Sequence, residues 1–288
     1  MRYADALAFA VQTLCVFAGN SRLFGLLSPG SGWYTNVEMS VRYASLVTPA
    51  KYAFAIWGVI YTWETAAMIY LFTGPSAWGV VQSQLWIAAN VFQALWAPLF
   101  AMERLTLSAL SLSGIAVCLV CLGLSLREAT GVPVALLSAP VWLHAGWTTA
   151  ASLVNLNLVL AAAGSSAPLQ LSAAFASVHV ALAIGVAVLY ASWTSEALGS
   201  TLGSTLAPLP YALALGWALW AVRAELRTPD LIKGASAYHE IGEAGRAALE
   251  MACKASVVAL AVGSAAMAGV HFVTGSLAWT RLCASSLL

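Results

Sequence analysis

Long apolar runs separated by short polar stretches recur along this chain. A helix of ~20 residues, rising ~1.5 Å per residue, crosses a hydrocarbon core ~30 Å thick. Backbone groups find no water in that core, and runs of this length are too long for barrel strands, so the spans must be helices. We therefore predict an all-α polytopic membrane protein with eight spans, at residues 5–27, 53–73, 80–102, 106–126, 132–160, 168–193, 205–222 and 248–275.

The composition supports this fold class and excludes several functions. Hydrophobic residues make up 61% of the chain and charged residues 8%, against about one quarter charged in soluble proteins. No nucleotide-binding loop, hydrolase triad or metal-ligand box is present, so we expect no metal site built by side chains alone and no ordinary soluble-enzyme mechanism. The net charge of +1 gives no indication of a nucleic-acid partner.

The charges divide unevenly between the two sides of the predicted helix array. If eight helices alternate, one side keeps only Arg2, Arg127 and Arg281. By the positive-inside rule the other side faces the cytoplasm, stroma or matrix, and both termini lie opposite it. That basic side carries Arg22, Arg42, Lys51, Arg104, Arg223, Arg227, Lys233, Arg246 and Lys254.

The first apolar run and the cysteines have simple interpretations. The N-terminal run resembles a signal peptide but has no persuasive cleavage site, so we interpret it as a retained span. The five cysteines, including Cys118 and Cys121 in one helix, form neither a disulfide framework nor a zinc pattern. We interpret that pair as small apolar residues at a helix contact.

Two polar stretches and one break organise the chain. Residues 28–52 form an unusually long membrane loop, which is typical of a lid, a binding loop or disorder. Residues 223–250 concentrate charge and fit either a helix beside the membrane or a solvated connector. The AGSSAP stretch separates a five-helix unit, 1–162, from a three-helix extension, 163–288, and we expect any site in the first unit.

Three helices of the first unit carry mixed aromatic and amide stripes. Helical spacing places Trp57, Tyr61 and Glu64 on one face of the second helix. Similar stripes contain Asn90, Gln93 and Trp96 on the third helix, and His144, Trp147 and Asn155 on the fifth. Each residue alone could be an interhelical hydrogen-bonding or interface residue. Together they favour a pocket, because aromatic walls with a few placed polar groups suit a flat hydrophobic ligand.

The ionisable residues inside the spans require partners. Glu64 needs a proton or a cation in this medium, and Arg22 and His144 are both candidates. His179 and His271 stand alone on later helices, where a packing role is the simpler interpretation. An imidazole can also bind the metal of a tetrapyrrole, so His144, His179 and His271 are candidate axial ligands.

Three segments resemble the TspO/MBR family of tryptophan-rich sensory proteins, related to the mitochondrial translocator protein, over about residues 5–160. PAKYAFAIWGVIY is similar to the family's second helix through Pro49, Phe54, Trp57 and Tyr61. QLWIAANVFQALWAPLF resembles its third helix, and APVWLHAGWTTAASLVNLNLVL its fifth. The match is closer to longer relatives that continue past five helices, as an eight-helix chain would.

This resemblance implies a five-helix bundle with a pocket under the loop between the first two helices. Family members bind porphyrins, some bind sterols or synthetic ligands, and light-dependent porphyrin breakdown has been proposed for bacterial members. The residues carried over are Trp57, Tyr61, Gln93, Trp96, Trp147 and Asn155. Gln93 stands where an asparagine is expected, Glu64 where short members are apolar, and the three extra helices have no counterpart in them.

Two classes of function follow. The first is a non-catalytic receptor, carrier or sensor that holds a porphyrin, haem, chlorophyll or similar flat molecule in the tryptophan-rich pocket. The second is an accessory subunit of a photosynthetic or respiratory membrane complex, or a homodimer, with pigment or lipid in the ancestral pocket. Transport through Glu64 is a weaker third, because no inverted repeat or pair of broken helices is present.

Overall fold

The computed structural model describes residues 2–74, 78–126, 133–196 and 208–285, with backbone alone at 192–196 and 270–285. No strand occurs in these ranges. The elements are α1 (Arg2–Asn20), α2 (Asn36–Arg42), the 3₁₀ turn η1 (Lys51–Ala55), α3 (Ile56–Thr73), α4 (Val80–Ala101), α5 (Leu105–Ser125), the π-helical turn η2 (Val134–Ser138), α6 (Ala139–Ala162), α7 (Ala167–Glu196), α9 (Leu209–Arg227), α10 (Ser236–Glu240) and α11 (Gly242–Ser285).

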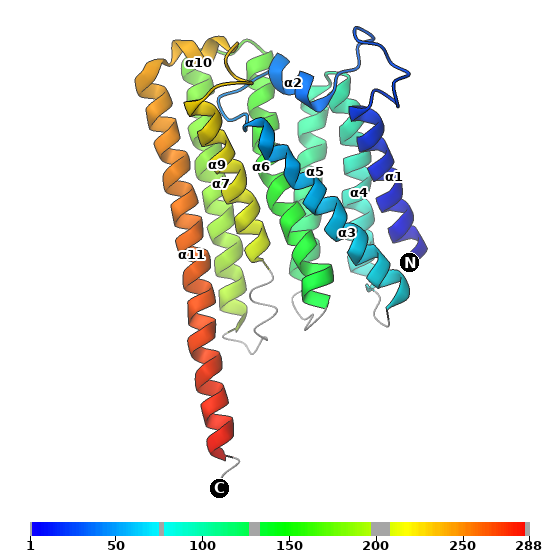
Figure 1. The fold of residues 1–288 in the computed structure, drawn as a ribbon, viewed down its shortest axis with the longest axis vertical. Helices are drawn as coiled ribbons and strands as arrows, with labels where there is room; N and C mark the ends of the chain where they lie inside the picture. The colour runs from blue at the N-terminus through cyan, green and yellow to red at the C-terminus, as the bar shows by residue number, and fades with distance from the viewer. Residues whose placement is uncertain (1, 75–77, 127–132, 197–207, 286–288) are drawn as a thin grey trace.

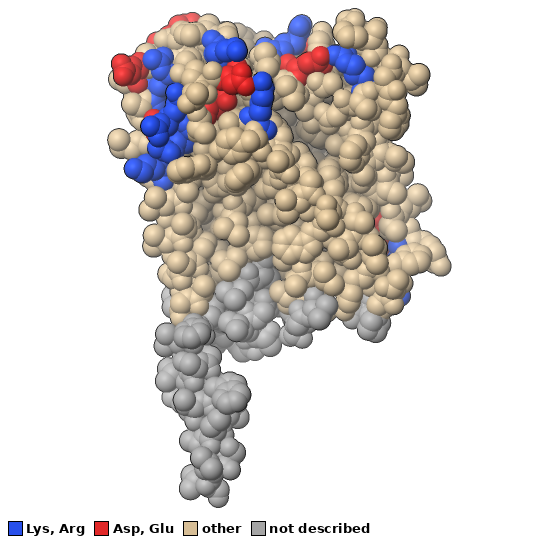
Figure 2. Space-filling view, viewed as in Figure 1, with Lys and Arg blue, Asp and Glu red and all other residues tan. Residues whose placement is uncertain are grey.

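The long helices run side by side, and short elements close one end of the array (Figure 1). The short helices α2 and α10 lie at that end, whereas the N-terminus and the far end of α11 lie opposite. Lys, Arg, Asp and Glu gather at the α2 and α10 end, above a broad uncharged band (Figure 2). Arg127 and the side chain of Arg281 lie outside the described residues.

Five helical segments are long and apolar enough to cross a membrane, judged over the described ranges by length and composition. The protein is therefore an all-α, multi-pass integral membrane protein. The other three predicted spans correspond to α1, α4 and α9, which are less apolar. These helices bury polar side chains against their neighbours, including Gln12, Gln93 and Glu225.

The first helix is shorter than the prediction of 5–27, because α1 ends at Asn20. Arg22, Leu23 and Phe24 have φ values of 51°, 51° and 58°, which end a right-handed helix. Arg22 then donates to the carbonyl of Trp33 at 2.8 Å and pairs with Glu38. The chain therefore turns back over the helix end instead of adding another turn.

The polar segment 223–250 is not one helix beside the membrane. It contains the end of α9, a loop, α10 and the first turns of α11. The loop is fixed by the buried carboxylate of Glu225, which accepts the backbone N–H groups of Asp230, Leu231 and Ile232 at 2.6, 2.5 and 3.1 Å. Three charge-assisted bonds to one carboxylate stabilise a turn at Pro229 that a continuous helix would not allow.

Helix α6 is the centre of the molecule and joins the two predicted units. It contacts α3 and α5 on one side and α7 and α9 on the other. A Cβ at Gly146 would lie 2.5 Å from the backbone oxygen of Tyr211, so glycine lets α6 and α9 approach closely. Close backbone approach at small residues is how membrane helices gain contact without a hydrophobic driving force.

Short connections, such as those from Thr73 to Gly79 and from Met102 to Leu105, predict that consecutive helices pack as antiparallel neighbours. Helix α3 departs from this expectation. It crosses the array obliquely (Figure 1) and packs against α1, α6 and η2. The pairs α4 with α5, α5 with α6 and α6 with α7 do follow the expectation. The oblique course carries the polar stripe of α3 across the face of α6.

Candidate functional site

Trp57 is the hub of an aromatic cluster formed by α3, α4 and α6. Its ring centroid lies 5.5 Å from that of Tyr61 and 6.4 Å from that of Trp96, both nearly parallel. The edges of His144 and Trp147 meet it at 5.5 and 6.1 Å, nearly perpendicular. Stacked and edge-to-face rings at such separations are favourable beyond their buried area. The three predicted stripes therefore converge at one tryptophan.

A cavity lies next to this hub, toward the charged end. Its space free of protein atoms is about 880 Å³, part of it open to the surroundings. This figure includes space open to the surroundings, so the enclosed part of the cavity is smaller. The aromatic wall consists of Phe54, Trp57, Trp96, Phe100 and Trp147. The rest of the lining includes small and aliphatic side chains, among them Ala150, Ala151, Val178, Ala181, Ala218 and Leu219.

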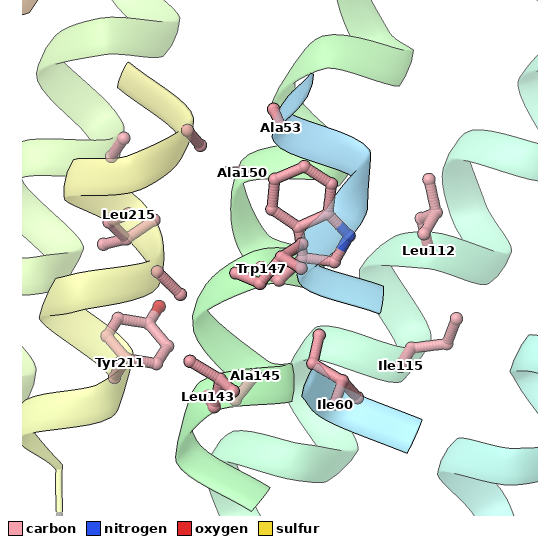
Figure 3. Close-up of a cluster of buried hydrophobic side chains, with 14 of the residues drawn as sticks. Ala53, Ile60, Leu112, Ile115, Leu143, Ala145, Trp147, Ala150, Tyr211 and Leu215 are labelled. Carbon is pink, nitrogen blue, oxygen red and sulfur yellow. The ribbon is translucent and has the colours of Figure 1, made fainter. Parts of the chain in front are cut away.

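Trp147 illustrates how the helices build the aromatic wall. It projects from α6 toward the start of α3 and toward Leu112 of α5 (Figure 3). Its side chain is 3% exposed, yet its indole N–H has no acceptor among the described residues. The indole N–H of Trp96 likewise has no acceptor among the described residues. Buried donors without partners are uncommon in native structures, so two of them beside one cavity indicate a polar binding capacity.

Four polar side chains contribute to the cavity lining. Asn155 and Ser177 lie on α6 and α7, and Asn36 and Ser40 lie on α2. The oxygen of Asn155 accepts a 3.4 Å hydrogen bond from Ser108, which fixes the orientation of its amide. The polar groups are few and widely separated within an apolar lining, as in sites for hydrophobic ligands.

The segment from Arg22 to Pro49 is fastened over one side of the cavity. Thr35 and Glu38 form a reciprocal capping box at the start of α2. The backbone N–H of Thr35 lowers the pKa of the Glu38 carboxyl, with smaller contributions from the Thr35 hydroxyl and Arg22. Tyr34 N–H donates to the carbonyl of Ala101 at 2.9 Å. These bonds hold α2 where Asn36 and Ser40 reach the cavity.

Seven of the nine predicted site residues fall into three groups. Trp57, Trp96, Trp147 and Asn155 line the cavity. Tyr61 accepts a 2.9 Å hydrogen bond from Gln93, beside the cavity wall and not on it. Asn90 bonds to the carbonyl of Trp86 in its own helix at 2.8 Å and is the least connected to the site.

Glu64 and His144 form a buried pair between α3 and α6. His144 Nδ1 lies 2.7 Å from Glu64 Oε1, and the two side chains are 5% and 1% exposed. Of the two partners proposed for Glu64, His144 is therefore correct. Arg22 is wrong, because it pairs with Glu38 in the loop. Trp57 lies between this pair and the cavity, in edge contact with His144.

Of the histidines proposed as axial ligands, His144 and His179 do not line the cavity. His144 is engaged by Glu64, and His179 is exposed on α7 with its Nδ1 at 2.7 Å from the carbonyl of Phe175. The side chain of His271 lies outside the described residues.

Several lining residues were not predicted from the sequence. Asn36 and Ser40 had one signal, the length of the loop that contains them. Val178 and Ala181 on α7, and Ala218 and Leu219 on α9, come from the extension and had no comparable signal. These residues extend the site beyond the first unit, because α6 packs against α7 and α9 as well as against α3 and α5.

A helical membrane protein with a tryptophan-rich cluster at the meeting point of three helices is the class that this fold and site define. Comparison with protein-family models agrees: a model for TSPO-like proteins matches residues 22–240. The chain belongs to the TSPO-like family. The match covers most of the chain and runs through α7, α9 and α10, well beyond the expected limit near residue 160. Neither the curated proteins nor the solved structures that were searched gave a significant match.

Proposed function

We propose that this TSPO-like membrane protein binds a flat hydrophobic molecule, a tetrapyrrole or a compound of similar shape, in the cavity beside Trp57. The observation that carries the proposal is the aromatic wall of the cavity, in which two buried indole N–H groups lack a partner among the described residues. The aromatic rings of the lining can stack on a planar ligand, and the remaining lining side chains are mostly small or aliphatic.

The polar groups suggest how such a ligand would be oriented. The indole N–H groups of Trp96 and Trp147 are donors, and the Asn155 amide offers both a donor and an acceptor. A ligand with carboxylate or carbonyl groups at its edge would satisfy the donors that the protein leaves unpaired. The role is that of a receptor, carrier or sensor, because the described residues that line the cavity include no nucleophile paired with a base.

A metal-free macrocycle suits the lining best. An axial ligand would require an imidazole directed into the cavity, and the described histidines occupy other positions. Protoporphyrin is therefore the appropriate first probe, and haem is the informative comparison.

Quenching of tryptophan fluorescence tests the proposal. The purified chain is titrated with protoporphyrin, and the titration is repeated with Trp147→Phe and Asn155→Ala. Trp63→Phe is the matched control, because Trp63 lies off the cavity and donates to the carbonyl of Ala135. We expect saturable quenching that weakens in the first two variants and persists in the control. Absence of saturation, or equal behaviour of all three variants, would refute the proposal.

A further inference from the structure

Basic side chains outnumber acidic ones where α9 meets α11 near the charged end. Arg223 Nη2 lies 3.1 Å from Glu250 Oε1, and Arg227 Nε lies 3.6 Å from the same oxygen. Lys254 follows Glu250 by one helical turn on α11 and is exposed. It forms no ion pair within the described part of the chain. Glu250 therefore pairs with both arginines, and no described carboxylate pairs with Lys254.

The side chain of Arg223 is fixed by its neighbours, but one of its hydrogen-bond donors has no acceptor among the described residues. Its guanidinium carbon lies 4.8 Å from the centre of the Trp220 ring, and its side chain is 14% exposed. The buried Nε of Arg223 has no acceptor among the described residues. Arg227 is 57% exposed, so its remaining donors face outward. A guanidinium has five N–H donors, and one shared carboxylate cannot satisfy two such groups.

Exposed apolar side chains begin where these charges end. On α9, Leu213, Trp217 and Trp220 are exposed at spacings of four and three, which places them on one face. On α11, Val258 and Val262 are exposed at successive turns after Lys254. Figure 2 shows the charged end giving way to a wide uncharged band. Tryptophan beside arginine and lysine at such a boundary is typical of the membrane interface.

We propose that Arg223, Arg227 and Lys254 bind the phosphate of an anionic phospholipid, whose acyl chains follow the exposed apolar side chains of α9 and α11. Charge complementarity supports this occupant, because Arg223 and Arg227 share the Glu250 carboxylate and Lys254 has no ion-pair partner among the described residues, next to an exposed apolar surface. The continuation into an apolar surface favours a lipid over a free phosphate ion.

This lipid site is separate from the cavity beside Trp57. The cavity takes Ala218, Leu219 and Val222 from α9, whereas the lipid site uses the exposed Trp220 and Arg227 of that helix. The two proposals can therefore fail independently. Glu250 orients the arginines and, by its charge, opposes an anionic headgroup, so its removal should change lipid binding in a direction that loss of structure would not.

Native mass spectrometry of the purified full chain provides the test. The chain is equilibrated with equal amounts of phosphatidylglycerol and phosphatidylcholine, and the lipid retained is counted. We expect preferential retention of phosphatidylglycerol, falling roughly tenfold or more in Arg227→Gln/Lys254→Gln, since each basic residue near a membrane contributes ~1 kcal/mol. Arg223 is left intact because it packs on Trp220. Glu250→Gln should retain more phosphatidylglycerol than the unmodified chain.

Lys51→Gln/Lys233→Gln is the matched control. It removes two positive charges from the same end, but from lysines that pair with Asp230. We expect its lipid retention to equal that of the unmodified chain. An equal loss in this control, equal retention of the two lipids, weaker retention in Glu250→Gln, or displacement by millimolar glycerol phosphate would each overturn the proposal.

Discussion

His144 and Glu64 meet in the interior of the helix array, with Nδ1 of the imidazole 2.7 Å from one carboxylate oxygen. The pair links α3, which crosses the array obliquely, to the central helix α6. The second carboxylate oxygen and the Nε2 of His144 have no further partner among the described residues. Each residue is thus the principal polar partner of the other, in a position where water and lipid offer no substitute.

Removing both partners should destabilise the protein less than the sum of the two single removals. Truncation of one member of a buried pair leaves an uncompensated polar group and costs about 3–5 kcal/mol. We expect Glu64→Ala and His144→Ala each to lower the free energy of unfolding by that order. The double variant should be less destabilised than the sum, with a coupling of about 0.5–3 kcal/mol. Unfolding in detergent, followed by circular dichroism, measures the cycle, and strict additivity would show that the pair is not coupled.

Trp57 should control ligand affinity more than stability. Trp57→Phe keeps a ring at the hub but reduces the aromatic surface facing the cavity. We expect protoporphyrin binding to weaken roughly two- to tenfold, which corresponds to the ~0.5–1.5 kcal/mol of one aromatic contact. Binding can be measured by porphyrin absorbance to avoid the loss of a fluorophore. Trp63→Phe is the control, and equal effects of the two substitutions would contradict a specific role for Trp57.

Gly146 should tolerate no side chain. An added Cβ would lie 2.5 Å from the backbone oxygen of Tyr211, so α6 and α9 would have to separate. We expect Gly146→Ala to lower stability by about 1–3 kcal/mol, as overpacking does. Gly216→Ala is the matched control, because nothing lies within 4 Å of its Cβ position, and it should be neutral or slightly stabilising. Thermal unfolding of both variants tests this prediction, and equal unfolding temperatures for the two would contradict it.

The loop before α2 should open as the pH falls. The backbone N–H of Thr35 holds the pKa of the Glu38 carboxyl below its ordinary value of 4.5. A carboxyl whose folded pKa is lowered stabilises the fold above its ordinary pKa, and this contribution is lost as pH drops through the folded pKa. We expect amide exchange at Thr35 and Asn36, corrected for intrinsic rates, to accelerate below about pH 4.5. Glu38→Gln should exchange faster at neutral pH and lose the pH dependence.

The aromatic residues of the site could be predicted from the sequence more readily than the rest of the cavity lining. Trp57, Trp96 and Trp147 could be assigned because helical spacing places each on a polar and aromatic stripe, and the structure brings the three together. Asn90 satisfied the same pattern but bonds within its own helix. Helical spacing identifies which residues share a face of a helix, but it does not identify the element that this face will contact.

Ala181 and Ala218 show that sequence patterns can also miss residues that line the cavity. Both line the cavity, yet an alanine in a membrane helix carries no signal that distinguishes a pocket wall from a helix contact. Their role depends on how closely α7 and α9 pack against α6. Similarly, the partner of Glu64 could be reduced to two candidates but not chosen, since the choice depends on the oblique course of α3.

The sequence by itself determined that the chain is an all-α membrane protein, that it is TSPO-like, and which faces of three helices carry its aromatic residues. Those properties follow from hydrophobicity and helical period, which are local. The tertiary structure alone decided that His144 pairs with Glu64, that α6 joins both units into one core, and that α7 and α9 complete the cavity. These depend on helix crossing and close backbone approach, which arise from contacts between residues distant in the chain.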